Sequence, residues 1–260
     1  MVEVSHLSKN YGSHPAIRDL TFSVADGQVY GLLGPNGAGK STIMNILTGY
    51  LAPTGGEVKV AGFSLPEQAQ QAKACVGYLP EQPPLYPEMT VQEYLDFAAE
   101  LKGVKKAQRR EQVQQAARRT GLDQVMPRLI RSLSKGYKQR VGIAQALLGS
   151  PRLIILDEPE TGLDFHNQIL VLNLVERLAH ESGISAIMNT HYPTNAMSVA
   201  DEALMLNRKG EFFYGPAAEI LNEENISYSF DVQVLVDELH YQGRSVRSIV
   251  PVGLREETAV

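Results

Sequence analysis

A glycine-rich stretch that follows an apolar run constrains the fold of this chain more than any other feature. Residues 29–33, Val-Tyr-Gly-Leu-Leu, have the character of a buried strand, and residues 34–42 read Gly-Pro-Asn-Gly-Ala-Gly-Lys-Ser-Thr. The second stretch fits the phosphate-binding pattern G-x-x-x-x-G-K-S/T. Ile43, Ile46 and Leu47 then recur at the spacing of one helix face. Strand, phosphate-binding loop and helix in this order predict an α/β fold that holds a phosphorylated ligand.

Each part of this loop has a chemical task. Its glycines allow backbone N–H groups to turn inward around an anion, and a helix beginning near Lys40 adds the positive end of its dipole. We expect Lys40 to reach the β- and γ-phosphates and Ser41 to supply a hydroxyl for Mg²⁺. The alternative is a glycine-rich turn that binds no nucleotide. The predicted ligand contacts are Asn36, Gly37, Ala38, Gly39, Lys40, Ser41 and Thr42.

Composition narrows the class of protein. The 260 residues can form one large domain or two small ones, and the net charge of −5 gives no electrostatic reason to expect nucleic-acid binding. Cys75 is the only cysteine, which excludes an intrachain disulfide and favours a reducing compartment. No stretch approaches the roughly 20 apolar residues that span a bilayer, and the N-terminus lacks the apolar segment of a signal peptide. Work at a membrane would therefore require a partner chain.

Strand-like and helix-like segments alternate along the chain, as in a mostly parallel sheet covered by helices. Besides residues 29–33, the predicted core strands are Val76–Leu79, Leu153–Leu156 and Ile184–Asn189. Between about residues 83 and 150 the apolar spacing becomes helical, which predicts a helical insertion in the α/β core. After Leu206, the turn at Lys209-Gly210 predicts a hairpin.

A second motif, Leu-Ile-Ile-Leu-Asp-Glu-Pro, occupies residues 153–159. Its four apolar residues predict a buried strand, and the two acids follow at the edge where open parallel sheets bind ligands. Asp157 is suited to hold Mg²⁺ directly or through water, and Glu158 to take a proton from a water aligned on the γ-phosphate. The alternative is that both acids only cap the next helix.

With Leu-Ser-Lys-Gly-Tyr-Lys-Gln-Arg at residues 133–140, these motifs resemble the ATP-binding cassette (ABC) family of transport ATPases over about residues 1–215. The family's LSGGQ signature reads LSKGY here, and this variant followed by KQR is similar to the ABC-2-type exporter branch. The resemblance implies a P-loop NTPase (RecA-like) core with a mostly parallel sheet, an N-terminal antiparallel β portion and an inserted helical subdomain. It implies an ATPase domain at residues 1–220 and a C-terminal extension of unknown role at 221–260.

The resemblance also assigns roles to single residues. Tyr11 matches the aromatic residue that stacks on adenine, and His191 matches the switch histidine that contacts the γ-phosphate and orients the attacking water. Asp164 matches the D-loop between the two nucleotide sites. Ser134 and Gly136 match signature residues that contact the γ-phosphate held by the opposite subunit. The alternatives are surface packing for Tyr11, a helix N-cap for Asp164 and a helix-start turn for the signature pair.

Some positions depart from the family pattern. Glu81 stands at the Q-loop position where the family has glutamine, and Gln82 follows it, so either residue is a candidate for the Mg²⁺ site. Glu160 stands where the family usually has threonine, and Phe165 where it usually has proline. Asn195 falls near a position that is often acidic. These departures leave the symmetry and rate of the site open.

The resemblance implies two cassettes that pair head to tail around two ATP, with Mg²⁺, and drive an integral membrane permease subunit, with a lean toward export. The pair is a homodimer or a heterodimer. The chain would then be cytoplasmic and peripheral on the inner face of the membrane, with its docking surface near residues 81–89. Alternatives are a soluble ABC-superfamily ATPase not involved in transport, a weakly active nucleotide-binding partner in a heterodimer, and a P-loop kinase. A kinase would leave residues 134–140 unexplained.

Residues 221–260 fall outside the resemblance. Phe230, Val232, Val234 and Val236 alternate with other positions and predict a short strand, and residues 246–252 predict another. The last residues, 255–260, are expected to fray. The extension is either a regulatory or dimer-stabilising element or an appendage that covers the core.

Overall fold

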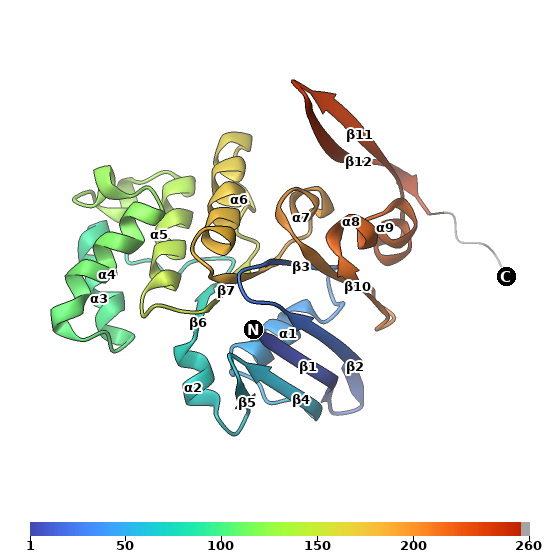
Figure 1. Cartoon of the computed structure of the whole chain (residues 1–260), viewed down its shortest axis with the longest axis horizontal. Helices are drawn as coiled ribbons and strands as arrows, with labels where there is room; N and C mark the ends of the chain where they lie inside the picture. The colour runs from blue at the N-terminus through green and yellow to red at the C-terminus, as the bar shows by residue number, and fades with distance from the viewer. Residues whose placement is uncertain (256–260) are drawn as a thin grey trace.

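A six-stranded sheet forms the centre of the computed structural model, which describes residues 1–255 (Figure 1). The strand order is β10-β9-β3-β8-β7-β6, and only β10 runs antiparallel to its neighbour within this sheet. The strands are β3 (Val29–Leu33), β6 (Val76–Leu79), β7 (Leu153–Asp157), β8 (Ser185–Asn189), β9 (Glu202–Leu206) and β10 (Phe212–Pro216). The predicted core strands and the hairpin at Lys209-Gly210 are confirmed.

Alternate residues of β7 face two different cores, because side chains of a strand point to opposite sides of the sheet. Ile154 and Leu156 pack with the helices on one side, and Leu153 and Ile155 pack with α1 (Lys40–Leu47) on the other. Both faces of this strand are therefore covered, which explains its continuous apolar run. Asp157, the first polar residue, lies where the covered strand ends.

An antiparallel sheet from the N-terminal part covers the α1 side, with the order β2-β1-β4-β5. Its strands are β1 (Val2–Tyr11), β2 (His14–Val24), β4 (Gly55–Val60) and β5 (Phe63–Leu65), and α2 (Ala69–Ala74) follows. Residues of α1 such as Ile43 and Ile46 are fully buried between the two sheets. The sheet places Tyr11, the last residue of β1, beside the glycine-rich loop.

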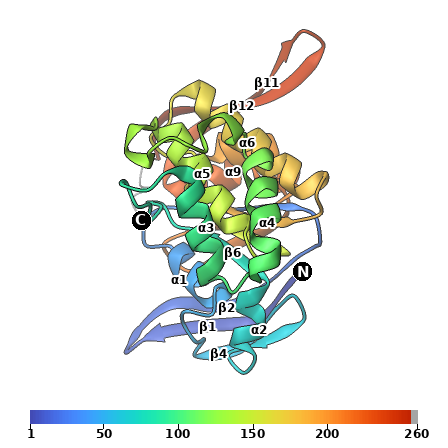
Figure 2. The same ribbon diagram turned by 90° about the vertical axis from the view of Figure 1, so that its left-hand side faces the viewer.

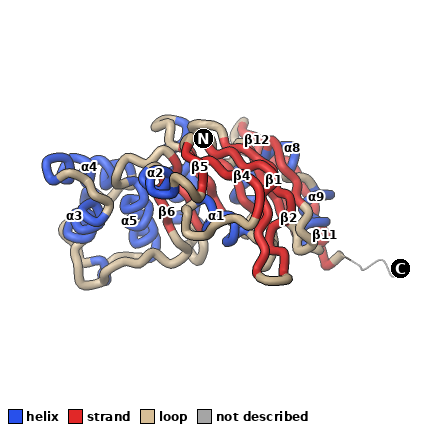
Figure 3. The backbone as a smooth tube through the Cα atoms, turned by 90° about the horizontal axis from the view of Figure 1, so that it is seen from below, coloured by secondary structure: helices blue, strands red, loops and turns tan. Residues whose placement is uncertain are grey.

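The predicted helical insertion lies at one end of the molecule (Figures 1 and 3). It contains α3 (Val91–Leu101), α4 (Lys106–Arg119) and α5 (Lys135–Leu147), with short 3₁₀ turns at Asp123–Val125 and Ile130–Ser132. Helix α3 starts with a capping box, in which Thr90 and Glu93 satisfy each other's backbone N–H groups. Figure 2 views this helical group face on. Helices α6 (Phe165–His180) and α7 (Pro193–Val199) connect the later strands of the core.

Helix α8 (Ala217–Ile220) precedes the predicted C-terminal extension, which contains α9 (Glu223–Phe230) and a hairpin of β11 (Val232–Tyr241) and β12 (Arg244–Leu254). Leu221, Ile226 and Val234 are buried against the core, whereas the outer part of the hairpin projects from the molecule (Figures 1 and 2). Leu235 and Leu239 are more than half exposed, as are their cross-strand partners.

The two predicted strands of the extension exist but are longer than expected. The placement of Phe230 in the first of them was wrong. Phe230 ends α9, because Asp231 adopts a left-handed backbone conformation that terminates the helix. The expected fraying concerns residues 256–260, which lie outside the described part of the chain.

Within residues 1–255, no helix combines the length and the apolar character that crossing a membrane demands.

Candidate nucleotide site

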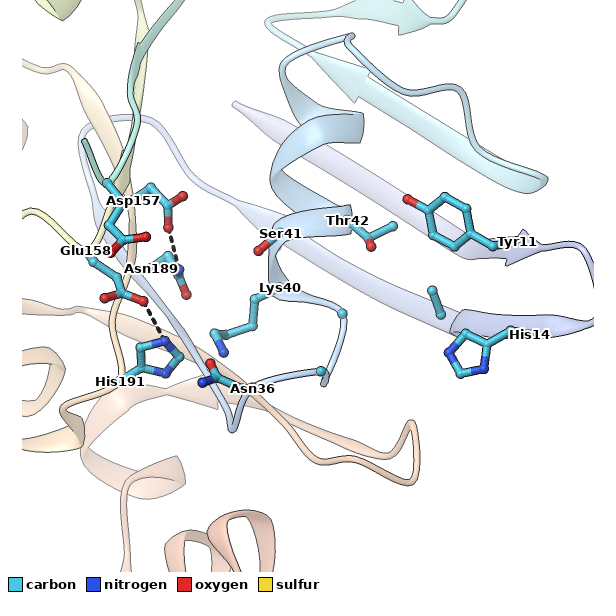
Figure 4. Close-up of a pocket in the computed structure, with 14 residues that line it drawn as sticks. Tyr11, His14, Asn36, Lys40, Ser41, Thr42, Asp157, Glu158, Asn189 and His191 are labelled. Atoms are coloured by element: carbon cyan, nitrogen blue, oxygen red, sulfur yellow. Dashed lines mark hydrogen bonds and ion pairs between the residues drawn. The ribbon is translucent and has the colours of Figure 1, made fainter. Parts of the chain in front are cut away.

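A cavity of about 400 Å³ lies at the carboxyl ends of β3, β7 and β8 (Figure 4). The glycine-rich loop forms one wall, the ends of β7 and β8 form the facing wall, and Tyr11 and His14 lie beyond the start of α1. The lining residues are Tyr11, His14, Ala16, Asn36, Gly37, Gly39, Lys40, Ser41, Thr42, Glu81, Asp157, Glu158, Asn189 and His191.

The loop wall is shaped by its backbone. Gly34 and Gly39 have φ angles of 142° and 99°, which residues with a side chain rarely adopt. A Cβ atom would lie 2.5 Å from the carbonyl oxygen of Leu206 at position 34, and 2.7 Å from that of Ala16 at position 39. Neither position has room for a larger residue. Gly39 is also the N-cap of α1, and no side chain in residues 1–255 caps this helix, so its first N–H groups face the cavity side.

Lys40 is the buried cation of this wall. Its side chain is 5% exposed, and Nζ donates hydrogen bonds to the carbonyl oxygens of Gly34 at 2.6 Å and Pro35 at 3.0 Å. Burial lowers the pKa of Lys40 to about 8, although the nearby Glu158 and Asp157 act in the opposite direction. An arriving phosphate would therefore meet a partly desolvated ammonium that already points along the loop.

The facing wall is a network of side chains. Asn189 donates from Nδ2 to Oδ1 of Asp157 at 2.7 Å, and its carbonyl accepts a 2.9 Å bond from the N–H of Glu158. Burial raises the pKa of Asp157 above its ordinary value, and the Asn189 hydrogen bond opposes the shift. Nε2 of His191 lies 2.5 Å from Oε1 of Glu158, as Figure 4 shows. Thr161 donates to Oε2 of Glu158 at 3.0 Å, so both oxygens of that carboxylate have partners.

Oxygen donors from both walls fit a Mg²⁺ ion that takes most of its ligands from water and phosphate. The Ser41 hydroxyl and the Asp157 carboxylate line the same cavity, and both are oxygen ligands of the type that Mg²⁺ prefers. In residues 1–255 no group of three or more His, Cys, Asp or Glu is placed to hold a metal on its own. A magnesium ion shared with a nucleotide agrees with this arrangement.

A family model described as ABC transporter matches residues 17–161, which is more than half of the chain. The chain belongs to the ABC transporter family. Within this family it is the ATP-binding cassette, an ATPase. The match includes the glycine-rich loop, the signature segment and the acids at the end of β7.

The names of similar proteins are consistent with this family assignment. YxlF of Bacillus subtilis, an uncharacterized ABC transporter ATP-binding protein, is 33% identical over 90% of this chain and 77% of its own length. The taurine import ATP-binding protein TauB of Escherichia coli is 34% identical over 80% of each chain. The Nod factor export ATP-binding protein I of Rhizobium etli is 32% identical over 85% of this chain and 70% of its own length.

A solved ABC structure has the same fold. CbiO1 of Clostridium perfringens, part of the ABC transporter complex cbiONQ, matches with a TM-score of 0.79 and 26% identity. The match covers 87% of this chain and 92% of that structure. The predicted fold class, a P-loop core with an antiparallel β portion and a helical insertion, is confirmed.

Most of the ABC motif residues predicted from sequence come together at the cavity. The predicted residues that line it are Tyr11, Asn36, Gly37, Gly39, Lys40, Ser41, Thr42, Glu81, Asp157, Glu158 and His191. Ala38 is a loop residue whose side chain is buried, and Gln82 is exposed and does not line the cavity. Of the two Q-loop candidates, Glu81 is therefore the one that faces the cavity.

The residues predicted to form the signature and the D-loop lie outside the cavity lining. Ser134 is the N-cap of α5, where its hydroxyl accepts from the N–H of Tyr137 at 3.4 Å. Asp164 is the N-cap of α6 and accepts from the N–H of Asn167 at 2.8 Å. Gly136 packs against the Asn167 side chain, leaving no space for a Cβ atom. Ser134 and Asp164 are both exposed, so they remain available to a second molecule.

Sequence reasoning missed three lining residues: His14, Ala16 and Asn189. His14 and Ala16 come from β2, whose position over the loop depends on how the two sheets pack. Asn189 carried a usable signal, because it is the polar residue that ends a predicted apolar strand, and the structure pairs this strand with the one ending at Asp157.

Proposed function

We propose that this ABC cassette works as one of two subunits that pair head to tail around two ATP molecules. One observation carries the proposal: the P-loop lines the nucleotide cavity, whereas Ser134 and Asp164 are exposed outside it. A second copy that presents its signature turn would complete each site. The same surface would then serve both partners, as two-fold symmetry requires.

In this proposal Lys40 leaves the carbonyl oxygens of Gly34 and Pro35 and binds the terminal phosphates, while the N–H groups at the start of α1 hold their oxygens. Tyr11, half exposed at the far end of the cavity, stacks on the adenine. Glu158 takes a proton from the attacking water, and His191, beside its carboxylate, contacts the γ-phosphate and orients that water.

Ser41, Asp157 and Glu81 are the residues that would hold the magnesium ion, and the metal would neutralise phosphate charge there. Glu81 is exposed and extends from the loop after β6, so we assign it a contact through water. Hydrolysis would convert the bound ATP into ADP and inorganic phosphate. The hydrogen bonds that the γ-phosphate makes across the dimer interface would be lost, and the dimer would open.

We further propose that opening and closing drive an integral membrane permease subunit, which keeps the chain peripheral at the inner face of the membrane. CbiO1 and TauB, both similar to this chain, are named as parts of transport systems. The LSKGY signature followed by KQR and the similarity to a Nod factor export protein support export through an ABC-2-type permease. The similarity to taurine import proteins supports import instead, so direction requires measurement in vesicles.

The chemical half of the proposal is tested with Glu158→Gln. Removing a general base lowers turnover by roughly 10² to 10⁴-fold, while ATP binding is expected to persist because the phosphate cradle is untouched. Turnover is measured by phosphate release and binding by equilibrium dialysis. Unchanged turnover would remove Glu158 as the base.

The transport half is tested by affinity capture of the tagged chain from native membranes. We expect an integral membrane protein in stoichiometric amount, and capture that requires residues 81–89 would identify the docking surface. Recovery of the chain without any integral membrane protein would contradict the proposed partner.

A further inference from the structure

One buried carboxyl near the site has no part in the mechanism above. Glu160 lies two residues after Glu158 and is fully buried. Its Oε1 accepts hydrogen bonds from the hydroxyl of Thr190 and, at 3.2 Å, from Nδ2 of Asn195. Both donors belong to the segment that carries His191, so the hydrogen bonds that the Glu160 carboxyl makes with other side chains of residues 1–255 lead to that segment.

The contacts of Thr190 tie this segment on both sides of His191. The Thr190 hydroxyl donates to Glu160 and also accepts from the N–H of Tyr192 at 3.0 Å. The N–H of Thr190 bonds to the carbonyl of Leu32 at 3.1 Å. His191 is therefore flanked by two residues that are joined through the Thr190 hydroxyl, and Glu160 is the acceptor that orients this hydroxyl.

The buried carboxyl of Glu160 reduces the stability of the folded chain. Its second oxygen, Oε2, is buried without a hydrogen-bond partner among the described residues, and such a group reduces stability. Burial raises the pKa of Glu160 above its ordinary value, and the hydrogen bonds from Thr190 and Asn195 oppose the shift. A small apolar residue at this position would avoid the cost but would release Thr190 and Asn195.

We propose that Glu160 is a positioning residue, which fixes the segment Thr190–Asn195 so that the His191 imidazole stays against Glu158. It touches neither ATP nor the attacking water and acts through His191. The inference rests on the proposed roles of Glu158 and His191. Glu160 and Asn195 both depart from the family pattern. The hydrogen bond between them means that the proposed role of Glu160 involves both departures.

The test is a double-mutant cycle on ATP turnover. Glu160→Ala is expected to lower kcat by roughly 10- to 100-fold, the scale of a misplaced catalytic group, with the KM for ATP changed less than about twofold. In a His191→Ala background the same substitution should change kcat by less than about twofold, because the group it positions is absent. Glu160→Gln keeps the accepting oxygen and should recover most of the lost turnover.

A matched control separates positioning from general damage. Ser229 in α9 is also buried without a hydrogen-bond partner in the described part of the chain, and it lies outside the site. Ser229→Ala should leave kcat unchanged in both backgrounds. If Glu160→Ala fails to fold, Asn195→Ala removes only the 3.2 Å bond and should show a smaller loss that again disappears in the His191→Ala background.

Three results would overturn the inference, and they do so in two different ways. Equal losses with and without His191, or a raised KM with unchanged kcat, would contradict the positioning role alone. Unchanged turnover in His191→Ala would contradict the proposed function of that histidine, and with it the role of Glu160.

Discussion

The two walls of the nucleotide cavity differ in composition, because one is formed mainly by backbone and the other by side chains. The loop wall, residues 34–42, consists of backbone shaped by glycines, and at Gly34 and Gly39 a Cβ atom would clash with a backbone carbonyl. The facing wall consists of side chains from two separate segments, joined by hydrogen bonds between Asp157 and Asn189, Glu158 and His191, and Glu160 and Thr190. The first wall is specified by local sequence, and the second by which side chains meet in space.

This difference predicts which substitutions impair each wall, and within the loop wall Lys40 should show the largest effect on turnover. It is the one cation that the loop wall contributes to the cavity lining described here, and removing such a preorganised charge typically costs about 10² to 10³-fold in turnover. Lys40→Ala should also weaken ATP binding, measured with a fluorescent ATP analogue. Turnover within tenfold of the unmodified chain would show that the backbone alone holds the phosphates.

The glycines of the loop wall provide a matched pair. Gly37 and Gly39 both have positive φ angles, but only at Gly39 would a Cβ atom meet a backbone carbonyl, 2.7 Å away. Overpacking of this kind costs about 1 to 3 kcal/mol. We expect Gly39→Ala to weaken ATP binding at least about tenfold more than Gly37→Ala, by titration calorimetry. Equal effects would mean that backbone conformation, and not the contact with Ala16, limits the loop.

A substitution in the facing wall should change the affinity of the site for Mg²⁺. Asn189→Ala removes the 2.7 Å hydrogen bond to Asp157, and loss of such support typically lowers metal affinity by roughly 10 to 100-fold. The Mg²⁺ concentration for half-maximal turnover should rise by about tenfold, measured at saturating ATP. The same Mg²⁺ requirement in both proteins would exclude Asp157 as a ligand supported by Asn189.

Lys40 also predicts a pH dependence of ATP binding. Its pKa of about 8 in the free protein means that the ammonium, the form that attracts phosphate, is lost as pH rises through 8. Bound phosphate favours the ammonium, so affinity for ATP should fall by roughly fivefold between pH 8 and 9. Binding of a non-hydrolysable ATP analogue to the unmodified chain measures this without hydrolysis and keeps Glu158 beside Lys40. In Lys40→Arg the dependence should disappear, and a flat profile with Lys40 present would contradict its lowered pKa.

Sequence reasoning succeeded where a function depends on neighbouring residues. The loop and the strand ending at Asp157 are local patterns that the structure confirms. Ser134 and Asp164 are N-caps, as the alternatives of a helix-start turn and a helix N-cap expected, and their signature and D-loop roles stay predictions. The choice between Glu81 and Gln82 depended on which way a loop turns after β6. No periodicity reports that direction, and the structure was needed to place Glu81 at the cavity.

The parts that sequence reasoning missed depend on contacts between distant segments. Glu160 and Asn195 were visible only as departures from a pattern, and their hydrogen bond joins residues 35 positions apart. The hairpin β11–β12 was expected as two short strands, because alternation shows that a strand exists but not where it ends. Its outer half makes few contacts with the core, so burial gave no signal for its length.

Dimerisation of the Glu158→Gln protein tests the central claim, a nucleotide site completed across two copies, most directly. With saturating Mg-ATP, mass measurement in solution should show a dimer that contains two ATP, and Ser134→Arg in the same background should prevent the dimer while each chain still binds ATP. A protein that remains a monomer with bound ATP when hydrolysis is blocked, or a dimer indifferent to Ser134→Arg, would contradict the account.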